Sequence, residues 1–460
     1  MDMKFIGREK ELAKLNALYS SEKGSLAIIY GRRRVGKTYL LRKFAENKNV
    51  LWFTAFEGNA SMLLSSLNET ISRFFYRGNS DSISFSNIKS AMDFIFREAS
   101  AKHFAFIIDE YPYLAEAFPE VSSIIQMLLD VNKTEGKLMM ILSGSSMHFM
   151  EHQVLGIESP LYGRRDISLK IKPFSIRETA LMASDKYGME DIYKIWAITG
   201  GVPLYIDLFM RYRRLSECIA EEFFSDDGYF TIEAENIFRM EFRDSRNYFG
   251  VCNMIATGCN KTTAIADKLG LSTANVSAIL NNLAEIDIVE QKFSVKPASR
   301  RPIWKLKDPL LYFWFTFCYM INSNGMSSYF NANYPAFLGR RFEDLCTSLI
   351  PSIFPAESFS EIGSWWGGNP KTRKEEEIDI VAHSYSGYSV YCECKYTSGP
   401  IGNEVLNKLK ERSYLVDSGS DNAKKYILFS KSGFTEGLKH AEDVKCIDFK
   451  EAYSIAMDNL

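Results

Sequence analysis

The stretch that decides the fold of the first domain is Leu26-Ala27-Ile28-Ile29-Tyr30-Gly31-Arg32-Arg33-Arg34-Val35-Gly36-Lys37-Thr38. Its first five residues form a short apolar run, which is typical of a strand buried on both faces. The next eight residues match the pattern G-x-x-x-x-G-K-[ST], and a helical pattern runs from Thr38 to Asn47. In this strand–loop–helix context, glycines let backbone N–H groups turn inward around a phosphate. The stretch therefore predicts a nucleotide-binding site.

The residues of this loop have different expected roles. Lys37 should reach the β- and γ-phosphates of a nucleotide, and the Thr38 hydroxyl can be a ligand of Mg²⁺. A glycine turn with no ligand is the alternative, but chance rarely produces both the pattern and its context. The residues that we expect to contact the nucleotide are Gly31, Arg32, Arg34, Val35, Gly36, Lys37, Thr38 and Tyr39.

A second apolar run, Phe104 to Ile108, ends in Asp109 and Glu110. Ligands of α/β sheets bind at the carboxyl ends of the strands, so this run delivers two carboxylates to the expected phosphate site. We expect Asp109 to hold the Mg²⁺ shell and Glu110 to polarise the attacking water as a general base. The alternative is a capped strand end. Because the acid pair follows the strand directly, ATP hydrolysis is favoured over passive binding.

Two further residues are candidates for catalysis of hydrolysis. Ser143 ends the apolar run Leu138 to Leu142, where its hydroxyl could orient the lytic water or cap the next helix. Arg164, in Gly163-Arg164-Arg165, could stabilise phosphoryl charge from a neighbouring subunit, which would require self-association. A solvated basic loop is an equally good interpretation of Arg164.

The pattern of the whole chain is α/β with several domains. Strands expected at 26–30, 50–54, 103–108 and 138–142 alternate with helices at 9–19, 38–47, 60–76 and 87–100, which implies parallel βαβ units. We therefore expect four parts: a P-loop core over 1–172, a helical part over 173–245, a helical unit with a hairpin and connecting helices over 246–335, and a second α/β domain over 336–460.

Composition limits the class of protein. A chain of 460 residues should hold two to four domains, and 46% hydrophobic with 24% charged residues excludes wholesale disorder. The formal net charge of −2 gives no global basic field, so any nucleic-acid site must be local. The eight cysteines form no CxxC pair or zinc spacing and predict free thiols. Without a signal peptide or a membrane-length apolar run, we expect a cytoplasmic protein with no membrane partner.

Five segments together resemble a known family. They are Phe5-Ile6-Gly7-Arg8-Glu9, the P-loop, Ile108-Asp109-Glu110, Ser143-Gly144-Ser145-Ser146 and Thr199-Gly200-Gly201-Val202-Pro203. They resemble the prokaryotic, chiefly archaeal, AAA+ ATPases related to the STAND and origin-recognition ATPases. The resemblance implies an ATPase with a five-stranded parallel sheet, a helical lid, which would be the part over 173–245, and a winged helix with connecting helices, which would be the part over 246–335. It places the first segment near the adenine and the last in the lid. We find no Gly-Ala-Arg-like lid motif with a sensor arginine, which counts against ring-forming behaviour.

A helix–turn–helix pattern lies between 261 and 283. Lys261 to Leu269 and Ser272 to Leu283 have helical spacing of apolar residues, with Gly270 at the turn, and 288–295 with 303–306 would form a hairpin. The second helix could enter a DNA major groove with Thr273, Asn275, Ser277 and Asn281, but it has no Lys or Arg for phosphate contacts. A structural or protein-docking role is the alternative. The nearby positive residues are Lys261, Lys268, Lys292, Lys296, Arg300 and Arg301.

Charged residues converge on a predicted hairpin near the C-terminus. The segments 377–382 and 388–395 read as two strands joined by a turn at Ser384 to Gly387, which sets Asp379 opposite about residue 393. Glu393 and Lys395 then share one face with Asp379. Two carboxylates at this separation suit Mg²⁺ or Mn²⁺, and a nearby lysine can serve the attacking water. Glu343, on the preceding helix, could add a metal or water contact.

This arrangement resembles the PD-(D/E)xK restriction-endonuclease-like fold and the nuclease-like domain that often ends these archaeal ATPases. The resemblance covers about 336–460 and implies metal-dependent phosphodiester cleavage. A surface salt bridge between Glu393 and Lys395 is the alternative. The segment 331–460 contains 15 Lys and Arg against 19 Asp and Glu, and this net negative charge does not favour binding to DNA. The sequence thus favours an ATP-hydrolysing switch coupled to a nuclease or nucleic-acid-binding domain. A non-cutting signalling or scaffold ATPase that binds protein or DNA is the alternative.

Overall fold

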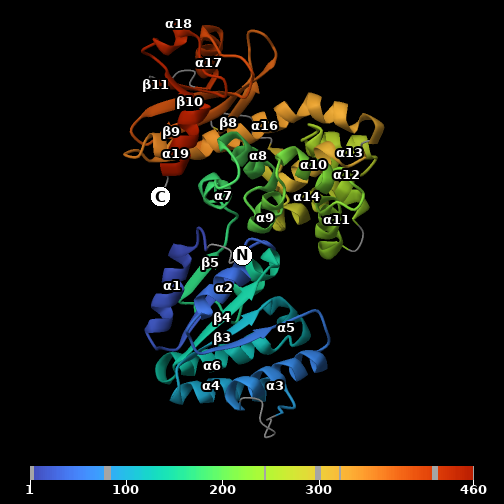
Figure 1. Cartoon of the computed structure of the whole chain (residues 1–460), viewed down its shortest axis with the longest axis vertical. Helices are drawn as coiled ribbons and strands as arrows, with labels where there is room; N and C mark the ends of the chain where they lie inside the picture. The colour runs from blue at the N-terminus through green and yellow to red at the C-terminus, as the bar shows by residue number, and fades with distance from the viewer. Residues whose placement is uncertain are drawn as a thin grey trace. The chain divides into compact units, whose positions relative to one another are not determined.

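The structure is a computed structural model that describes residues 5–76, 84–242, 245–295, 302–320, 323–416 and 423–458. The chain divides into two compact units, coloured along the chain in Figure 1. The first unit contains the chain up to Phe174 together with Val202–Tyr205. The second contains Ser175–Gly201 and the chain from Ile206 onward.

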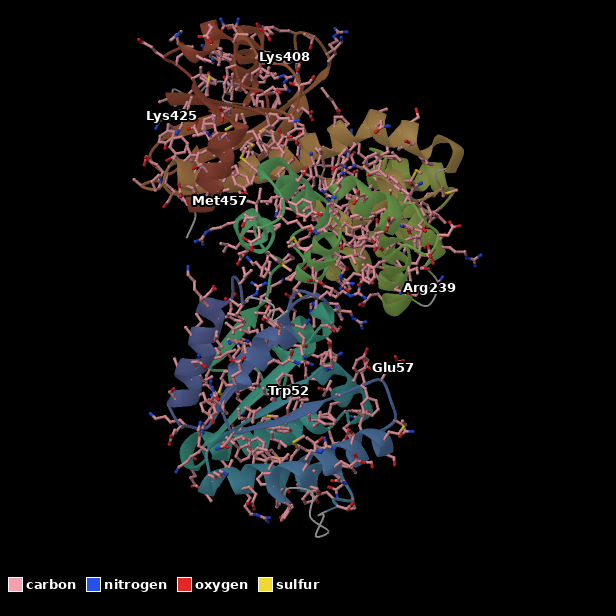
Figure 2. The ribbon with its side chains drawn as sticks, viewed as in Figure 1. Trp52, Glu57, Arg239, Lys408, Lys425 and Met457 are labelled. Carbon is pink, nitrogen blue, oxygen red and sulfur yellow. The ribbon has the colours of Figure 1, made fainter. Side chains whose placement is uncertain are left out.

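The first unit is built on a five-stranded parallel sheet, as the family resemblance implied. Its order is β2-β3-β4-β1-β5, so β2, which carries Trp52 (Figure 2), and β5 are the edge strands. Four of the strands lie where the apolar runs predicted them, whereas β5, whose four residues are mostly polar or half-buried, was not predicted. The strands are β1 (Ser25–Tyr30), β2 (Val50–Thr54), β3 (Phe104–Asp109), β4 (Leu138–Gly144) and β5 (Ile167–Lys170).

Helices cover both faces of this sheet because alternate strand residues are apolar on both sides. On β1, Ala27 and Ile29 pack with α1 and α2, whereas Leu26 and Ile28 pack with α3 to α6 (Figure 1). All six strand positions of β3 are buried, which explains its continuous apolar run. The helices are α1 (Glu9–Ser20), α2 (Lys37–Ala45), α3 (Ala60–Tyr76), α4 (Ile88–Ala101), α5 (Tyr111–Ala117), α6 (Val121–Glu135) and the short π-helix η1 (Phe149–Val154).

The second unit begins with helices, as expected for the region after 173. They are α7 (Ile176–Ala183), α8 (Met189–Thr199), α9 (Pro203–Arg211), α10 (Leu215–Phe223), α11 (Tyr229–Glu241) and α12 (Arg246–Ala256). Glycine is required at the turn between α8 and α9, because Gly200 and Gly201 have φ angles of 62° and 77°. The aromatic ring of Tyr193 on α8 packs on Phe342 and Phe449 of the C-terminal region, with centroids 6.2 and 5.4 Å away.

The helix–turn–helix and the hairpin form where the sequence predicted them. Helices α13 (Thr262–Leu269) and α14 (Thr273–Glu285) flank Gly270, whose φ is 65°, and the Ser272 hydroxyl accepts a hydrogen bond from the Asn275 N–H at 3.2 Å. Strands β6 (Val289–Lys292) and β7 (Ile303–Leu306) pair antiparallel. Three of the nearby positive residues named above, Lys296, Arg300 and Arg301, lie outside the described residues.

One helix is longer than the sequence pattern indicated. We expected helical residues over 308–335, a boundary near 336 and a second helix over 337–350, but α15 (Pro309–Phe317) is followed by one helix, α16 (Ser323–Ile353), which runs across that boundary. Pro335 lies inside α16, where a proline costs about 3 kcal/mol. Phe330 and Phe337, on either side of it, both pack on Phe313 of α15, with centroids 6.1 and 5.3 Å apart, and this packing offsets the cost.

The C-terminal part is a five-stranded mixed sheet of order β12-β11-β10-β9-β8. Strands β8, β9 and β10 are antiparallel, whereas β11 and β12 are parallel to β10. Strands β8 and β12 were not predicted from the sequence pattern. The elements are β8 (Phe359–Gly368), β9 (Glu375–Ser384), β10 (Tyr388–Lys395), α17 (Asn403–Val416), β11 (Ala423–Ser430), α18 (Glu436–Lys439), β12 (Lys445–Asp448) and α19 (Phe449–Asp458). Among the described helices of the whole chain, none has the length and hydropathy needed to cross a membrane.

Candidate functional site

The loop between β1 and α2 has the backbone shape of a phosphate cradle. Gly31, Arg34 and Gly36 have φ angles of 154°, 68° and 94°, which turn successive N–H groups toward the loop centre. A Cβ atom on Gly31 would lie 2.3 Å from the carbonyl oxygen of Ile171 at the end of β5. Only glycine therefore fits at position 31, and the fold itself demands the first glycine of the motif.

Lys37 is buried under this loop. Its Nζ donates hydrogen bonds to the carbonyl oxygens of Gly31 at 2.8 Å and Arg32 at 2.9 Å. Burial lowers the pKa of Lys37 to about 8, although the carboxylates of Glu110 and Asp109 act in the opposite direction. The side chain is thus held within the loop by two neutral acceptors, which an anionic phosphate can replace as a stronger partner.

Thr38 and Asp109 meet at the end of the sheet, as the sequence predicted. The Thr38 hydroxyl donates to Asp109 Oδ2 at 3.0 Å, and Asp109 is only 3% exposed. A hydroxyl and a carboxylate at the start of α2 and the end of β3 are the hard oxygen donors that suit Mg²⁺. These two residues therefore fit a Mg²⁺ site next to the phosphate loop.

Glu110 is held in a specific conformation. Its φ of 54° is left-handed, a state that costs a non-glycine residue on the order of 1–3 kcal/mol and is typical of functional sites. Its Oε2 accepts hydrogen bonds from the Ser145 hydroxyl at 2.7 Å and the Ser145 N–H at 3.2 Å. The sequence pattern did not predict a role for Ser145. The only signal in the sequence was its place in the run 143–146.

Ser143 and Arg164 have other surroundings. Ser143 is fully buried within β4, and its hydroxyl has no hydrogen-bond partner among the described residues, so the idea that it caps the next helix is wrong. Its contact with a lytic water stays a prediction. Arg164 makes two hydrogen bonds to the carboxylate of Asp130 on α6, at 2.7 and 2.9 Å, and one to the Pro160 carbonyl at 3.1 Å. These contacts give Arg164 a structural role within its own domain. Its action on a neighbouring subunit stays a prediction.

The segment expected near the adenine is joined to the phosphate loop. The ring of Phe5 packs against Tyr39 on α2 at 5.9 Å between centroids. Arg8, which we had not proposed as a functional residue, is 6% exposed, donates to the carbonyl oxygens of Val35 and Lys172, and lies over the ring of Phe174 at 5.0 Å. Arg8 therefore connects Val35 of the phosphate loop to Lys172 and Phe174, which lie after β5.

The C-terminal carboxylates lie together as the hairpin register predicted. β10 pairs with β9 in a register that sets Cys392 against Ile380, so one further step sets Glu393 opposite Asp379. The Cys394 N–H donates to Asp379 Oδ2 at 2.8 Å, which fixes this carboxylate at the strand pair. Residues opposite each other in an antiparallel pair point to the same face. The turn contains Gly387, whose φ is 83°.

Glu393 is buried, and only one of its two carboxylate oxygens has a partner among the described residues. Its Oε1 lies 2.6 Å from Lys395 Nζ and 3.5 Å from a guanidinium nitrogen of Arg412 on α17. Its Oε2 is buried and has no hydrogen-bond partner within the described residues. An unsatisfied buried carboxylate oxygen is costly, because burial removes the water that would otherwise solvate it. The sequence pattern gave no indication that Arg412 takes part.

Glu343 and Asp379 act on each other electrostatically. Burial and, as the next largest cause, the charge of Asp379 together raise the pKa of Glu343 to about 8. Burial likewise raises the pKa of Asp379 to about 7, with Glu393 as the next largest cause. The structure thus brings α16, β9 and β10 together at one group of carboxyls. In the ranges that the structure describes, however, no three His, Cys, Asp or Glu side chains are arranged so that they could hold a metal ion between them.

Comparison with known proteins addresses the first unit directly. Residues 5–209 match the model of a family described as an ATPase domain predominantly from Archaea. The chain carries a P-loop ATPase domain of the archaeal type. Residues 315–412 match a second family, described as archaeal and bacterial proteins of unknown function. That match includes Glu343, Asp379, Glu393 and Lys395, and it assigns them no role.

Two proteins of one archaeon are similar to this chain. The chain is 27% identical over 436 residues to an uncharacterized protein of Methanocaldococcus jannaschii, covering 92% of this chain and 94% of that protein. It is 50% identical over 46 residues to an uncharacterized ATP-binding protein of the same organism, which is 10% of this chain and 78% of that protein. In fold it resembles the Walker-type ATPase of Pyrococcus abyssi, with a TM-score of 0.51 and 21% identity over 68% of this chain and 96% of that one.

The hydrogen bonds from Ser145 give a testable prediction for the ATPase domain. We expect Ser145→Ala to lower kcat for ATP hydrolysis by about fivefold, or roughly 1 kcal/mol, because Glu110 loses a charge-assisted bond that positions it. The KM for ATP should stay unchanged, since Ser145 does not lie in the phosphate loop. Ser145→Thr should restore kcat, and Ser146→Ala is the matched control. A fall in ATP affinity with kcat preserved would contradict this positioning role.

Proposed function

We propose that this chain is an ATP-hydrolysing switch coupled to a C-terminal domain that cleaves phosphodiester bonds with a divalent metal. The observation that carries the second part is Glu393, whose buried Oε2 has no partner in the described chain and which lies opposite the half-buried Asp379. A divalent cation between these carboxylates would supply the missing partner and offset the cost of burying them. The ATPase part follows from the family of the first unit.

Each residue of the ATPase site has a proposed task. The loop N–H groups and Lys37 bind the β- and γ-phosphates, while Arg32, Arg34, Val35 and Tyr39 line the nucleotide. Thr38 and Asp109 would hold Mg²⁺, which neutralises phosphate charge when it is bound. Glu110, fixed by Ser145, accepts a proton from the attacking water.

The Glu110 assignment predicts a mutation with a clear signature. Glu110→Gln keeps an oxygen that can accept the Ser145 hydrogen bonds but loses the basicity of a carboxylate. We expect hydrolysis to slow by at least about tenfold, equivalent to 1.4 kcal/mol of barrier, with ATP affinity nearly intact. Steady-state turnover and calorimetric binding measure the two effects separately. Glu116→Gln, which changes an exposed glutamate on α5, is the control, and wild-type turnover of the Glu110→Gln variant would assign the base elsewhere.

The order of elements supports a restriction-endonuclease-like fold for the C-terminal domain. A helix, three antiparallel strands, a helix and a parallel strand follow one another as α16, β8, β9, β10, α17 and β11. In this proposal Asp379 and Glu393 would hold Mg²⁺ or Mn²⁺, a cation that would supply Lewis acidity to water and to the scissile phosphate, and Glu343 from α16 would add a metal or water contact. Lys395 orients the nucleophile from the same face of the strand.

We further propose that ATP gates the C-terminal site through the lid and the winged helix. The chain connectivity supports this coupling, because α9 starts in the first unit at Pro203 and continues into the second from Ile206. DNA is the proposed partner of the helix–turn–helix. Among the described residues of α14 no Lys or Arg occurs, so phosphate contacts there would have to come from its neighbours.

A cleavage assay tests the whole proposal. The full chain is incubated with single-stranded DNA, double-stranded DNA or RNA, with Mn²⁺ or Mg²⁺, in the presence and absence of ATP. The proposal predicts cleavage of at least one substrate that requires the metal and changes with ATP. Metal-independent degradation would indicate a contaminant. Absence of cleavage under all conditions, with ATP hydrolysis intact, would refute the coupled nuclease.

One observation favours the second candidate, a non-cutting signalling or scaffold ATPase. Glu393 Oε1 is already paired with Lys395 and Arg412, which is what a purely structural ion-pair cluster requires. In that case the C-terminal domain binds protein or DNA without cutting. Mn²⁺ binding distinguishes the two candidates, because only the nuclease requires Asp379 and Glu393 to share an ion.

A further inference from the structure

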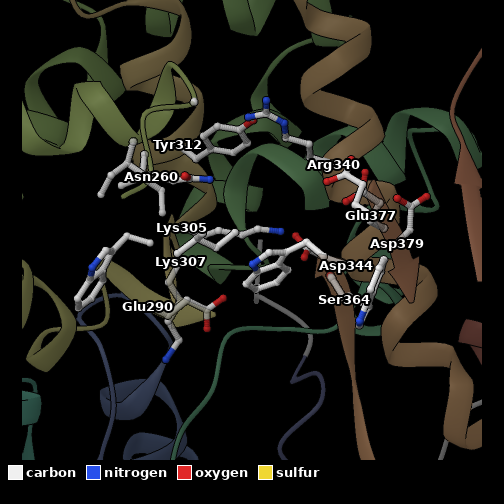
Figure 3. A pocket seen from close by; sticks show the side chains of 18 of the residues that line it. Asn260, Glu290, Lys305, Lys307, Tyr312, Arg340, Asp344, Ser364, Glu377 and Asp379 are labelled. Atoms are coloured by element: carbon white, nitrogen blue, oxygen red, sulfur yellow. The ribbon is translucent and has the colours of Figure 1, made fainter. Parts of the chain in front are cut away.

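A cleft of about 670 Å³ lies within the second unit and opens onto the candidate carboxylates. One of its walls comes from the region of the helix–turn–helix, including Lys261 and the hairpin strands β6 and β7. The other wall comes from α16, β8, β9 and α17, and it includes Glu343. Asp379 on the same wall is labelled in Figure 3. The hairpin is attached to the sheet edge, since the Val295 N–H donates to the Ser364 carbonyl at 3.0 Å.

The two walls of the cleft carry opposite charge. The hairpin wall is basic, because it presents Lys261, Lys305 and Lys307 against one acid, Glu290. The sheet wall is acidic despite three arginines, and its acids are Glu343, Asp344, Glu375, Glu376, Glu377 and Asp379. A ligand suited to this cleft combines cations on the acidic side with anions on the basic side. A metal-bound phosphodiester has that combination of charges.

Two cations in the cleft are available to a phosphate. Neither Lys305 nor Arg340 forms an ion pair with a carboxylate in the described part of the chain, and Arg340 instead donates to the Tyr312 hydroxyl at 2.7 Å. By contrast, Lys307 is paired with Asp287, and Lys261 lies 3.4 Å from Glu375. Lys305 extends from β7 toward the acidic side of the cleft (Figure 3), close enough to act on the charge of Glu343.

An aromatic side chain lies in the same cleft. Trp366 on β8 is half-buried, and its ring packs on no other ring in the described residues, although its backbone N–H and carbonyl are both bonded to the Ser294 hydroxyl at 2.8 and 3.0 Å. Indole faces held on a rigid strand are the platforms on which unpaired bases stack. A cleft of about 670 Å³ falls in the range that holds one compact ligand, so it suits a short unpaired segment and not a duplex.

We infer that this cleft is the substrate channel of the C-terminal site and takes an unpaired nucleic-acid strand, with Lys305 and Arg340 binding phosphates and Trp366 stacking on a base. Cleavage of a strand in this channel rests on the proposed nuclease function, whereas binding of the strand does not. It makes the β6–β7 hairpin part of the C-terminal site. The hairpin would therefore contribute to recognition of a strand held against the carboxylates of α16 and β9.

Direct binding tests this inference separately from cleavage. Fluorescence anisotropy is measured for the full chain with a labelled twelve-nucleotide DNA, the matching RNA and a hairpin duplex, with Ca²⁺ replacing Mg²⁺ to neutralise the acidic wall. We expect the unpaired strands to bind more tightly than the duplex. Lys305→Ala should weaken their binding by about fivefold to tenfold and reduce the salt slope by about one ion. Lys305→Arg should restore most of the affinity.

The control is Lys408→Ala, because Lys408 is an exposed lysine of α17 (Figure 2) that does not line the cleft. Lys305 is itself exposed, so its replacement should leave the fold intact. Binding that depends on Lys305 without any cleavage would support the channel and refute the proposed nuclease. Two results would refute the channel but not the nuclease. The first is cleavage by a protein whose affinity for single strands does not change in Lys305→Ala, and the second is a duplex that binds as tightly as single strands. No binding to any strand would also overturn the channel.

Discussion

Replacement of Lys37 by alanine is expected to reduce ATP affinity by at least about a hundredfold, which corresponds to about 2.7 kcal/mol of binding free energy. Lys37 is the buried cation of the phosphate loop, and its two hydrogen bonds to loop carbonyls are the contacts that phosphate oxygens would replace. No other lysine lies in the sequence of this loop. Isothermal titration with ATP and Mg²⁺ measures the loss.

A matched control separates this effect from loss of folding. Lys43→Ala removes a partly exposed lysine from the same helix, where Lys43 pairs with Glu46 at 2.7 Å, and it should bind ATP like the wild type. Circular dichroism of both variants checks the fold. ATP affinity that is unchanged in the Lys37 variant would contradict the assignment of the nucleotide site.

The second large effect concerns the C-terminal carboxylates. We expect Asp379→Ala, Glu393→Ala and Lys395→Ala each to reduce metal-dependent cleavage by about a thousandfold or more, since the groups act as a unit. ATP binding should be untouched in all three, because the nucleotide site belongs to the other unit. Gel-based cleavage rates and calorimetric ATP binding provide the two readouts.

Isosteric variants guard against misfolding of this cluster. Glu393→Ala would leave Lys395 and Arg412 without their shared partner, so Glu393→Gln is measured beside it. Asp379→Asn likewise keeps an acceptor for the Cys394 N–H. Glu442→Gln, which changes an exposed acid of the same domain, is the control. Cleavage that survives in Asp379→Asn and Glu393→Gln would place the reaction elsewhere.

Much of the ATPase site follows from local sequence. The pairing of Thr38 with Asp109 was predictable because each residue stands next to a recognisable strand, and parallel strands bring their carboxyl ends to one edge. The same reasoning set Asp379 opposite Glu393, because a hairpin with a short turn has a fixed register. In both cases, the position of each residue along its own strand was enough to predict which distant residue it would face.

Other features depend on packing that no local pattern contains. Ser145, and not Ser143, contacts Glu110, because the left-handed turn at position 110 directs its carboxylate toward the residue beyond the end of β4. Arg412 reaches Glu393 from a helix whose position over the sheet is set only by tertiary packing. The strands β5, β8 and β12 were missed because half-buried or polar residues interrupt their apolar runs.

The measurement that tests the central claim most directly is anomalous diffraction from a crystal of the full chain grown with Mn²⁺ and a non-hydrolysable ATP analogue. The nucleotide site provides an internal control, because Mn²⁺ should appear beside Thr38 and Asp109. The account predicts a second anomalous peak at about 2.0–2.4 Å from carboxylate oxygens of both Asp379 and Glu393. A peak at the nucleotide site with none at the C-terminal carboxylates would contradict the metal-dependent nuclease and favour the scaffold ATPase.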